Sequence, residues 1–184
     1  MRIISGKHRG TKLYTLEGLD TRPTLDRVKE PLFSIINFDL PDASVLDLFA
    51  GSGALGLEAI SRGASKAVLC DKSKKAIDII NKNIEKTKVE SKAQVINKDY
   101  LAALESLKGQ KFDIVFLDPP YETDFTEKAI EKIAEYGLLK QDGKIIIETD
   151  RKEKLVQNIE KLGLFDIYDE RKYGRVSLIF LRLK

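Results

Sequence analysis

Residues 44–63, SVLDLFAGSGALGLEAISRG, decide the fold. The segment begins as an apolar run of β character, passes through a glycine-rich turn and continues as a helical stretch that Gly63 ends. A strand that leads through such a turn into a helix is typical of α/β domains. We therefore expect an α/β fold that extends from this segment in both directions.

Strand-like and helix-like segments alternate on its C-terminal side, at intervals of roughly 25 residues. Further strands are expected at 66–71, 93–97, 112–121 and 143–149, and helices at 73–88, 99–107, 124–136 and 151–162. The last stretch, 164–184, predicts an antiparallel hairpin around Tyr173-Gly174. The pattern predicts a Rossmann-like, mostly parallel seven-stranded sheet with helices on both faces and a C-terminal hairpin.

An arm is expected on the N-terminal side. Residues 2–16 predict a small β-hairpin, and 23–37 carry apolar residues at helical spacing. Thr24 would be the N-cap of this helix, and Pro31 predicts a kink or a split within it. Pro41-Asp42 then separates an arm, residues 1–40, from a main domain, residues 41–184.

The composition excludes several kinds of protein. The 184 residues include one cysteine and one histidine, which argues against a disulfide framework, a metal site and a Ser/His/Asp triad. No run approaches the roughly 18 apolar residues of a membrane span, and the first residues lack the apolar core of a signal peptide. We expect a cytoplasmic, monomeric protein that uses no metal.

The basic residues gather at the two ends of a chain whose net charge is only +3. Residues 1–16 contain four lysines and arginines and no acid, and residues 171–184 contain five and no acid. Such ends can form a basic face for a polyanion if the fold brings them together. Two solvated strands with ordinary surface charges are the alternative.

An aspartate follows each of four successive predicted strands: Asp47, Asp71, Asp99 and Asp118. In open α/β sheets, ligands bind beyond the carboxyl ends of the strands. Each acid alone could be a helix cap. Four acids along one edge of the sheet indicate a binding site instead.

Gly51, Gly53 and Gly56 match the dinucleotide fingerprint G-x-G-x-x-G, and Asp71 follows Gly51 by 20 residues. A nicotinamide-dependent oxidoreductase is therefore an alternative. Against it, Asp47 would repel a pyrophosphate, and the main domain has no histidine for hydride-transfer chemistry. S-adenosylmethionine, which has an amino-acid end, a ribose and an adenine, suits this edge better.

For that ligand, Gly51 and Gly53 would let the backbone approach the methionine and ribose portion. Asp71 would accept hydrogen bonds from the ribose hydroxyls, and Asp99 from the adenine amino group, with Tyr100 or Leu101 covering the ring. Asp47 would either lie near the ammonium or order the glycine-rich turn.

Asp118-Pro119-Pro120-Tyr121 follows the fourth strand of the main domain. Because each proline fixes φ, this turn should be rigid. The Asp118 carboxylate and the Pro119 carbonyl can together accept two N–H bonds from an exocyclic amine, and Tyr121 can stack on the base. We expect catalysis to involve these four residues.

These residues resemble the (Asp/Asn)-Pro-Pro-aromatic signature of amino-group methyltransferases that act on bases. Together with RPTLDRVKE at 22–30 and DLFAGSGALGLEAISRGA at 47–64, the chain resembles the RsmD family, bacterial guanine-N2 methyltransferases of small-subunit ribosomal RNA. Pro31 departs from the helix former expected there. The resemblance implies that Arg22 and Thr24 lie beside the carboxylate of the cofactor.

The predicted site has three parts: the catalytic turn at 118–121, a cofactor-binding part and an RNA-binding part. The cofactor would contact Arg22, Thr24, Asp47, Phe49, Gly51, Gly53, Asp71, Lys72, Asp99, Tyr100 and Asp118. RNA would contact Lys7, Arg9, Lys12, Arg27, Arg171, Lys172 and Arg175, although Arg27 could be merely solvated. The reaction would transfer methyl to guanine N2 in small-subunit ribosomal RNA, free or in an assembling subunit, leaving S-adenosylhomocysteine. Methylation of adenine N6 in RNA or DNA, or a silent binding module, are the other hypotheses.

Overall fold

The computed structural model describes residues 1–16, 23–120 and 124–184, with the backbone alone for 23–27. The first elements are α1 (Pro23–Ile35), the short 3-10 helix η1 (Asn37–Asp39), β1 (Ser44–Asp47), α2 (Ala54–Ser61), β2 (Lys66–Asp71), α3 (Lys74–Thr87) and β3 (Ala93–Asn97). The chain continues through α4 (Tyr100–Ser106), β4 (Phe112–Leu117), α5 (Phe125–Glu135), β5 (Leu139–Thr149), α6 (Lys152–Leu162), β6 (Phe165–Tyr173) and β7 (Val176–Leu183).

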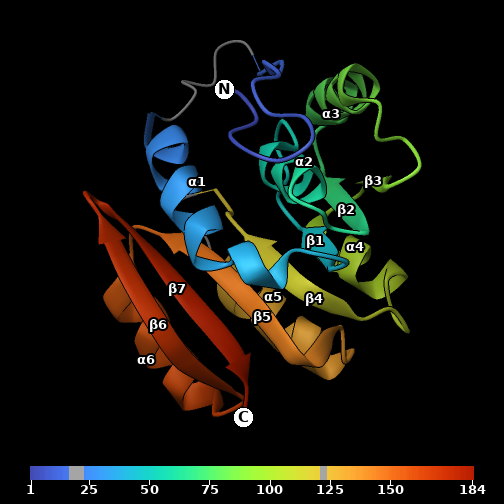
Figure 1. The fold of residues 1–184 in the computed structure, drawn as a ribbon. Coiled ribbons are helices and arrows are strands. Elements are labelled where there is room, and N and C mark those ends of the chain that lie inside the picture. Colours follow the sequence, from blue (N-terminus) through green and yellow to red (C-terminus); the bar gives the residue numbers. More distant parts are fainter. Residues whose placement is uncertain (17–22, 121–123) are drawn as a thin grey trace.

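The strands form one seven-stranded sheet in the order β3-β2-β1-β4-β5-β7-β6 (Figure 1). All pairs from β3 to β5 are parallel, whereas β7 is antiparallel to both β5 and β6. This confirms the predicted mostly parallel sheet with a C-terminal hairpin. The direction of the strand order reverses between β1 and β4, and ligands bind at such switch points.

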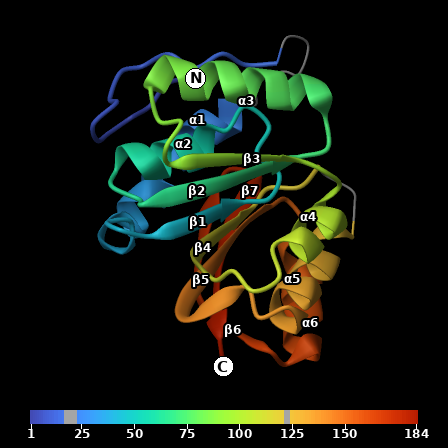
Figure 2. The ribbon, with the colours of Figure 1, turned by 90° about the vertical axis from the view of Figure 1, so that its right-hand side faces the viewer.

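Helices cover both faces of the sheet, as predicted (Figure 2). Side chains of α1, α2 and α3 form one buried apolar cluster with one face, and side chains of α4, α5 and α6 form a second cluster with the other. The first cluster also contains Ile3 and Leu13, so the arm shares the core of the main domain. In the described ranges, no helix is long and apolar enough to cross a membrane.

Two details of the arm differ from the predictions. Helix α1 runs unbroken past Pro31, so the predicted split is wrong, and Thr24 lies within its first turn because the helix begins at Pro23. Proline at the first helical position is favourable, because its missing N–H would have no partner there. Buried Leu32 and Phe33, and Ile36 just after the helix, hold the C-terminal half of α1 on the core despite the hydrogen bond that Pro31 lacks.

The predicted N-terminal hairpin is reduced to one antiparallel bridge, between Arg2 and Lys12. Gly6 and Gly10, at φ of 82° and 85°, turn the chain between them. The part of the arm before α1, residues 1–16, is called the arm from here on. It directs several of its backbone groups to side chains of α2 and α3 instead of to a second strand. Its position therefore depends on the main domain.

Candidate active site

A cavity of about 340 Å³ opens at the carboxyl ends of β1, β2, β3 and β4. Of the residues predicted from the sequence, its walls contain Phe49, Gly51, Asp71, Lys72, Asp99, Tyr100, Asp118, Pro119 and Pro120. The alternation of strands with helices sets this location, because it makes the strands parallel and parallel strands end at the same edge of the sheet. Three of the four strand-end acids thus border one cavity.

The glycine-rich turn forms the base of the cavity. Gly51 and Gly53 have φ of 55° and 79°, a region that disfavours residues with a Cβ. Gly56 lies in α2, where an added Cβ would come within 2.1 Å of the Leu69 side chain. The third glycine of the fingerprint therefore brings α2 close to β2, as in dinucleotide-binding turns.

Asp71 connects the turn to the end of β2. Its Oδ2 accepts from the Gly51 N–H at 3.0 Å, and its Oδ1 accepts from the Ser73 N–H at 2.8 Å. A carboxylate has four acceptor positions, so two remain for a ligand. Lys72 next to it is exposed, with its ammonium 6.0 Å from the centre of the Phe125 ring.

Asp47 is buried, and its Oδ2 accepts from the Gly56 N–H at 3.1 Å. Burial, and then the nearby Asp118 and Asp71, raise the pKa of this carboxyl to about 7 although the Gly56 bond lowers it. In the part of the chain that the structure describes, Asp47 and Gly53 are outside the cavity wall. Through its bond to the Gly56 N–H, Asp47 supports the glycine-rich turn.

Three aromatic residues form one wall of the cavity, the aromatic wall. Phe49, Tyr100 and Phe125 pack together, with ring centres 4.8–6.4 Å apart. Sequence reasoning missed Phe125 because it comes from the first residue of α5, far along the chain. Asp99 caps α4 through the Leu101 N–H at 3.0 Å, and its side chain is exposed.

The Asp-Pro-Pro turn follows β4 directly. Asp118 is half-buried, Pro119 is buried and Pro120 is exposed. All three border the cavity. Tyr121 lies outside the described residues, as does Arg22. Thr24 and Arg27 belong to α1, but their side chains are likewise outside the description.

Residues of the arm supply a wall that the sequence did not predict. Met1, Thr15 and Leu16 border the cavity, and Met1 also borders a neighbouring groove of about 440 Å³. Arg2 and Lys12 lie along that groove. No sequence signal marks these residues, because their place depends on how the arm packs against the main domain.

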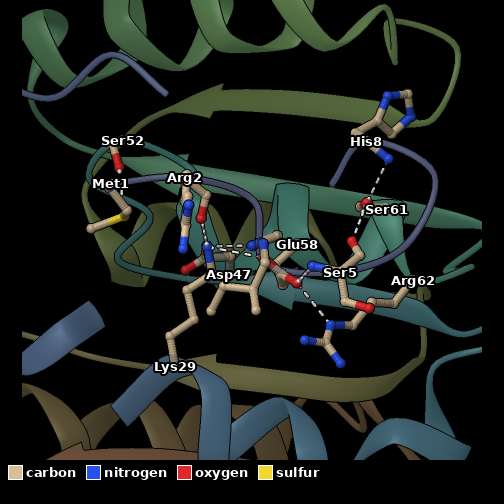
Figure 3. A network of polar contacts seen from close by, with 12 residues as sticks. Met1, Arg2, Ser5, His8, Lys29, Asp47, Ser52, Glu58, Ser61 and Arg62 are labelled. Carbon is tan, nitrogen blue, oxygen red and sulfur yellow. Dashed lines mark hydrogen bonds and ion pairs between the residues drawn. The ribbon is translucent and has the colours of Figure 1, made fainter. Parts of the chain in front are cut away.

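A buried ionic network fixes the arm (Figure 3). Glu58 of α2 accepts from the Ile4 and Ser5 N–H groups at 2.8 and 3.0 Å, and pairs with Lys29 at 3.0 Å and Arg62 at 2.8 Å. Lys29 also donates to the Arg2 carbonyl at 2.9 Å. Burial alone would raise the pKa of Glu58, but Lys29, the backbone N–H and Arg62 outweigh it and lower that pKa.

The structure separates the basic residues that were predicted to contact RNA. Arg171, Lys172 and Arg175 surround the β6–β7 turn, which lies at the same edge of the sheet as the cavity because Ser177 pairs with Thr149, the last residue of β5. Lys7 instead bonds through its N–H to the carbonyl of Ser61, the last residue of α2. Since α2 begins at the cavity, Lys7 lies about 12 Å away along this helix. Lys7, Arg9, Lys12 and the three tail residues are all exposed.

The described residues contain no cluster of three or more acids, histidines and cysteines that could hold a metal ion.

The family model described as "Conserved hypothetical protein 95" matches residues 1–182. A ribosomal RNA small subunit methyltransferase D from Haemophilus influenzae is 40% identical over 158 residues, 85% of this chain and 82% of that protein. The Escherichia coli protein of the same name is 39% identical over 150 residues, 82% of this chain and 75% of that protein. The solved structure of Escherichia coli yhhF, a candidate methyltransferase, has a TM-score of 0.86 at 34% identity and covers 100% of this chain and 98% of its own.

Proposed function

The chain belongs to the family described as conserved hypothetical protein 95, the RsmD family, and from this membership we propose that it is an S-adenosylmethionine-dependent methyltransferase. Its substrate is small-subunit ribosomal RNA, and the methyl acceptor is the N2 amine of a guanine. One observation carries the proposal: the Asp-Pro-Pro turn borders the same cavity as Asp71 and the aromatic wall. The enzyme acts in the cytoplasm, where ribosomal subunits assemble.

The residues present fit the cofactor. The Asp71 carboxylate keeps acceptor positions for the ribose hydroxyls after its bonds to Gly51 and Ser73. Tyr100 and Phe49 offer flat apolar faces for the adenine, and Asp99 lies at the rim to accept from its amino group. Gly51 allows the backbone to approach the methionine portion because it has no side chain.

The cofactor supplies an electrophilic methyl group on a positively charged sulfur. The Asp118 carboxylate and the Pro119 carbonyl accept the two N–H bonds of the guanine amine and direct its lone pair at that methyl. The nitrogen then attacks in line, a C–N bond forms as the C–S bond breaks, and one proton leaves the nitrogen for Asp118 or for water. Catalysis is mostly positioning, because no covalent enzyme intermediate is required.

The guanine must be unpaired or flipped out of its stack to reach Asp118. The surrounding phosphates are held by the exposed Arg171, Lys172 and Arg175 around the β6–β7 turn. Lys12, which borders the groove of about 440 Å³, holds them from the arm. Lys7 and Arg9 lie toward the other end of α2 and bind phosphates farther from the target base. These contacts predict that RNA affinity falls as salt rises, and an affinity that does not change with salt would remove the role of these residues.

The test uses S-adenosylmethionine labelled on its methyl group. It is offered with the protein to naked small-subunit RNA, to assembled small subunits that lack the modification, and to DNA. The products are digested and the labelled nucleoside is identified by mass. The proposal predicts N2-methylguanosine, and the better RNA substrate shows whether the enzyme reads free RNA or an assembled particle.

Asp118→Ala should lower kcat by about 10²–10³-fold, because it removes an acceptor that positions the reacting amine. Asp78→Asn, an exposed acid on α3, is the control and should leave kcat unchanged. Label in N6-methyladenine would overturn the guanine assignment and keep the methyl-transfer chemistry. Absence of label from all substrates would overturn the proposal.

A further inference from the structure

Asn83 of α3 joins the arm to the glycine-rich turn. Neither its sequence context nor the proposed chemistry assigns it a role. Its Oδ1 accepts from the Tyr14 N–H at 2.7 Å, and its Nδ2 donates to the Tyr14 carbonyl at 3.0 Å. The same Nδ2 donates to the Ser52 carbonyl at 2.9 Å. One side chain thus bonds both to the arm and to the glycine-rich turn, and both segments border the cavity.

These bonds matter because they lie next to residues that border the cavity. Tyr14 immediately precedes Thr15 and Leu16, which border the cavity, and Ser52 lies between the two glycines with positive φ. Asn83 is fully buried, so its amide has no water to replace a lost partner. Displacing the arm from α3 removes the two Tyr14 bonds that hold the Asn83 amide in place, and so weakens its third bond, which restrains Ser52 in the glycine-rich turn.

We propose that Asn83 is a positioning residue that couples the seating of the arm to the binding of the cofactor. The inference rests on the proposed function, because it takes the cavity to be the S-adenosylmethionine site. Cofactor bound on the glycine-rich turn favours the seated arm. If RNA held by Lys12 also favours the seated arm, the cofactor strengthens RNA binding, and by thermodynamic linkage RNA strengthens cofactor binding by the same factor.

The first test compares Asn83→Leu with Asn81→Leu, an exposed asparagine on the same helix. S-adenosylhomocysteine binding is measured by calorimetry, and amide hydrogen exchange is followed in residues 11–16. In the wild-type protein and in the control, the ligand should slow exchange of these arm amides. In Asn83→Leu, the affinity should fall about tenfold and the ligand should no longer protect the arm.

A second pair of variants acts from the arm and leaves the buried side chain intact. Tyr14→Pro removes the N–H that Asn83 accepts, whereas Tyr14→Ala removes the half-exposed ring and keeps the N–H. The proposal predicts that Tyr14→Pro uncouples the arm as Asn83→Leu does, and that Tyr14→Ala does not. This pair keeps the inference testable even if Asn83→Leu fails to fold.

Kinetics separate positioning from general destabilisation. Tyr14→Pro should raise the KM for S-adenosylmethionine about tenfold and leave kcat at saturating cofactor within about twofold, because it does not touch the reacting amine. It should also abolish the increase in S-adenosylhomocysteine affinity that a small-subunit RNA fragment produces in the wild-type protein.

The two proposals fail in different ways. A wild-type protein that does not bind S-adenosylhomocysteine would overturn the proposed function and this inference with it. A wild-type protein that binds and methylates, but whose arm exchange is unaffected by the ligand, would overturn the inference alone. The same conclusion would follow if Tyr14→Pro kept wild-type KM and arm protection.

Discussion

Two buried carboxylates at helix α2 are in opposite electrostatic situations: Asp47 of β1 and Glu58 of α2 itself. Asp47 lies beside the first turn of α2, where the Gly56 N–H is its hydrogen-bond donor, and its pKa is raised to about 7. Glu58, in the second half of the helix, has Lys29 and Arg62 beside it, and its pKa is lowered. Both side chains are almost inaccessible to solvent.

The difference shows that burial alone does not decide how an acid behaves. Removing a carboxylate from water disfavours its charge, and only nearby cations or several donors reverse that effect. Glu58 has both, because the arm brings backbone N–H groups and α1 brings Lys29. Asp47 faces Asp118 and Asp71 instead, since strand-end acids gather at the cavity. One end of α2 thus anchors the arm and the other supports a ligand site.

The largest effect is expected from Glu58→Leu. It removes the carboxylate beside buried Lys29 and the acceptor of the Ile4 and Ser5 N–H groups, which should lower the free energy of unfolding by about 3–5 kcal/mol. Chemical unfolding measures this loss. Glu85→Leu, at an exposed position of α3, is the control and should change stability little.

Adding Lys29→Met to Glu58→Leu sharpens the comparison. The double variant no longer has the fully buried Lys29 ammonium without its carboxylate, so it should recover part of the lost stability, although Arg62 and the Ile4 and Ser5 N–H groups still lack that partner. A double variant that is as unstable as the sum of two independent losses would contradict the pairing.

A smaller effect is expected from pH. Between about pH 4 and 7 the folded chain holds a proton on Asp47 that the unfolded chain has lost, so stability should fall as pH rises through this range. Asp47→Asn should remove this decline and be more stable than the wild-type protein at pH 8. Unfolding curves across pH 4–8 test this, and parallel profiles for the two proteins would refute it.

Glu58 should act in the opposite direction when the unfolding curves are extended below pH 4.5. Its pKa is lowered in the folded chain, so its contribution is present above the ordinary pKa of 4.5 and is lost as pH falls below it. Asp47→Asn should therefore leave the acid side of the profile unchanged.

The smallest effect separates two glycines of the arm. Both Gly6 and Gly10 have positive φ, but a Cβ at Gly6 would lie 1.9 Å from the Ser61 carbonyl, whereas a Cβ at Gly10 meets nothing within 4 Å. Gly10→Ala should cost about 1 kcal/mol from backbone strain alone. Gly6→Ala should cost more than this, because the arm must shift away from the Ser61 backbone to make room for the Cβ, and it should speed hydrogen exchange in residues 3–8. Equal effects of the two substitutions would show that the Ser61 contact does not hold the arm.

Much of the fold follows from sequence because its signals are local. The glycine-rich turn after 44–47, the alternation of apolar strands with amphipathic helices and the Asp-Pro-Pro turn each predict a structure from neighbouring residues. Parallel strands then place Asp71, Asp99 and Asp118 at one edge without further information. These elements were predicted within a few residues of their observed bounds.

Tertiary packing decided the rest. Nothing in the sequence indicated that Thr15 and Leu16 would border the cavity, that Phe125 would join Phe49 and Tyr100, or that Lys7 would lie away from the tail residues. These placements depend on contacts between segments far apart in the chain, such as Asn83 with Tyr14 and Glu58 with Ile4. Local patterns determine which element forms, but only the burial of distant groups against one another determines where the arm lies.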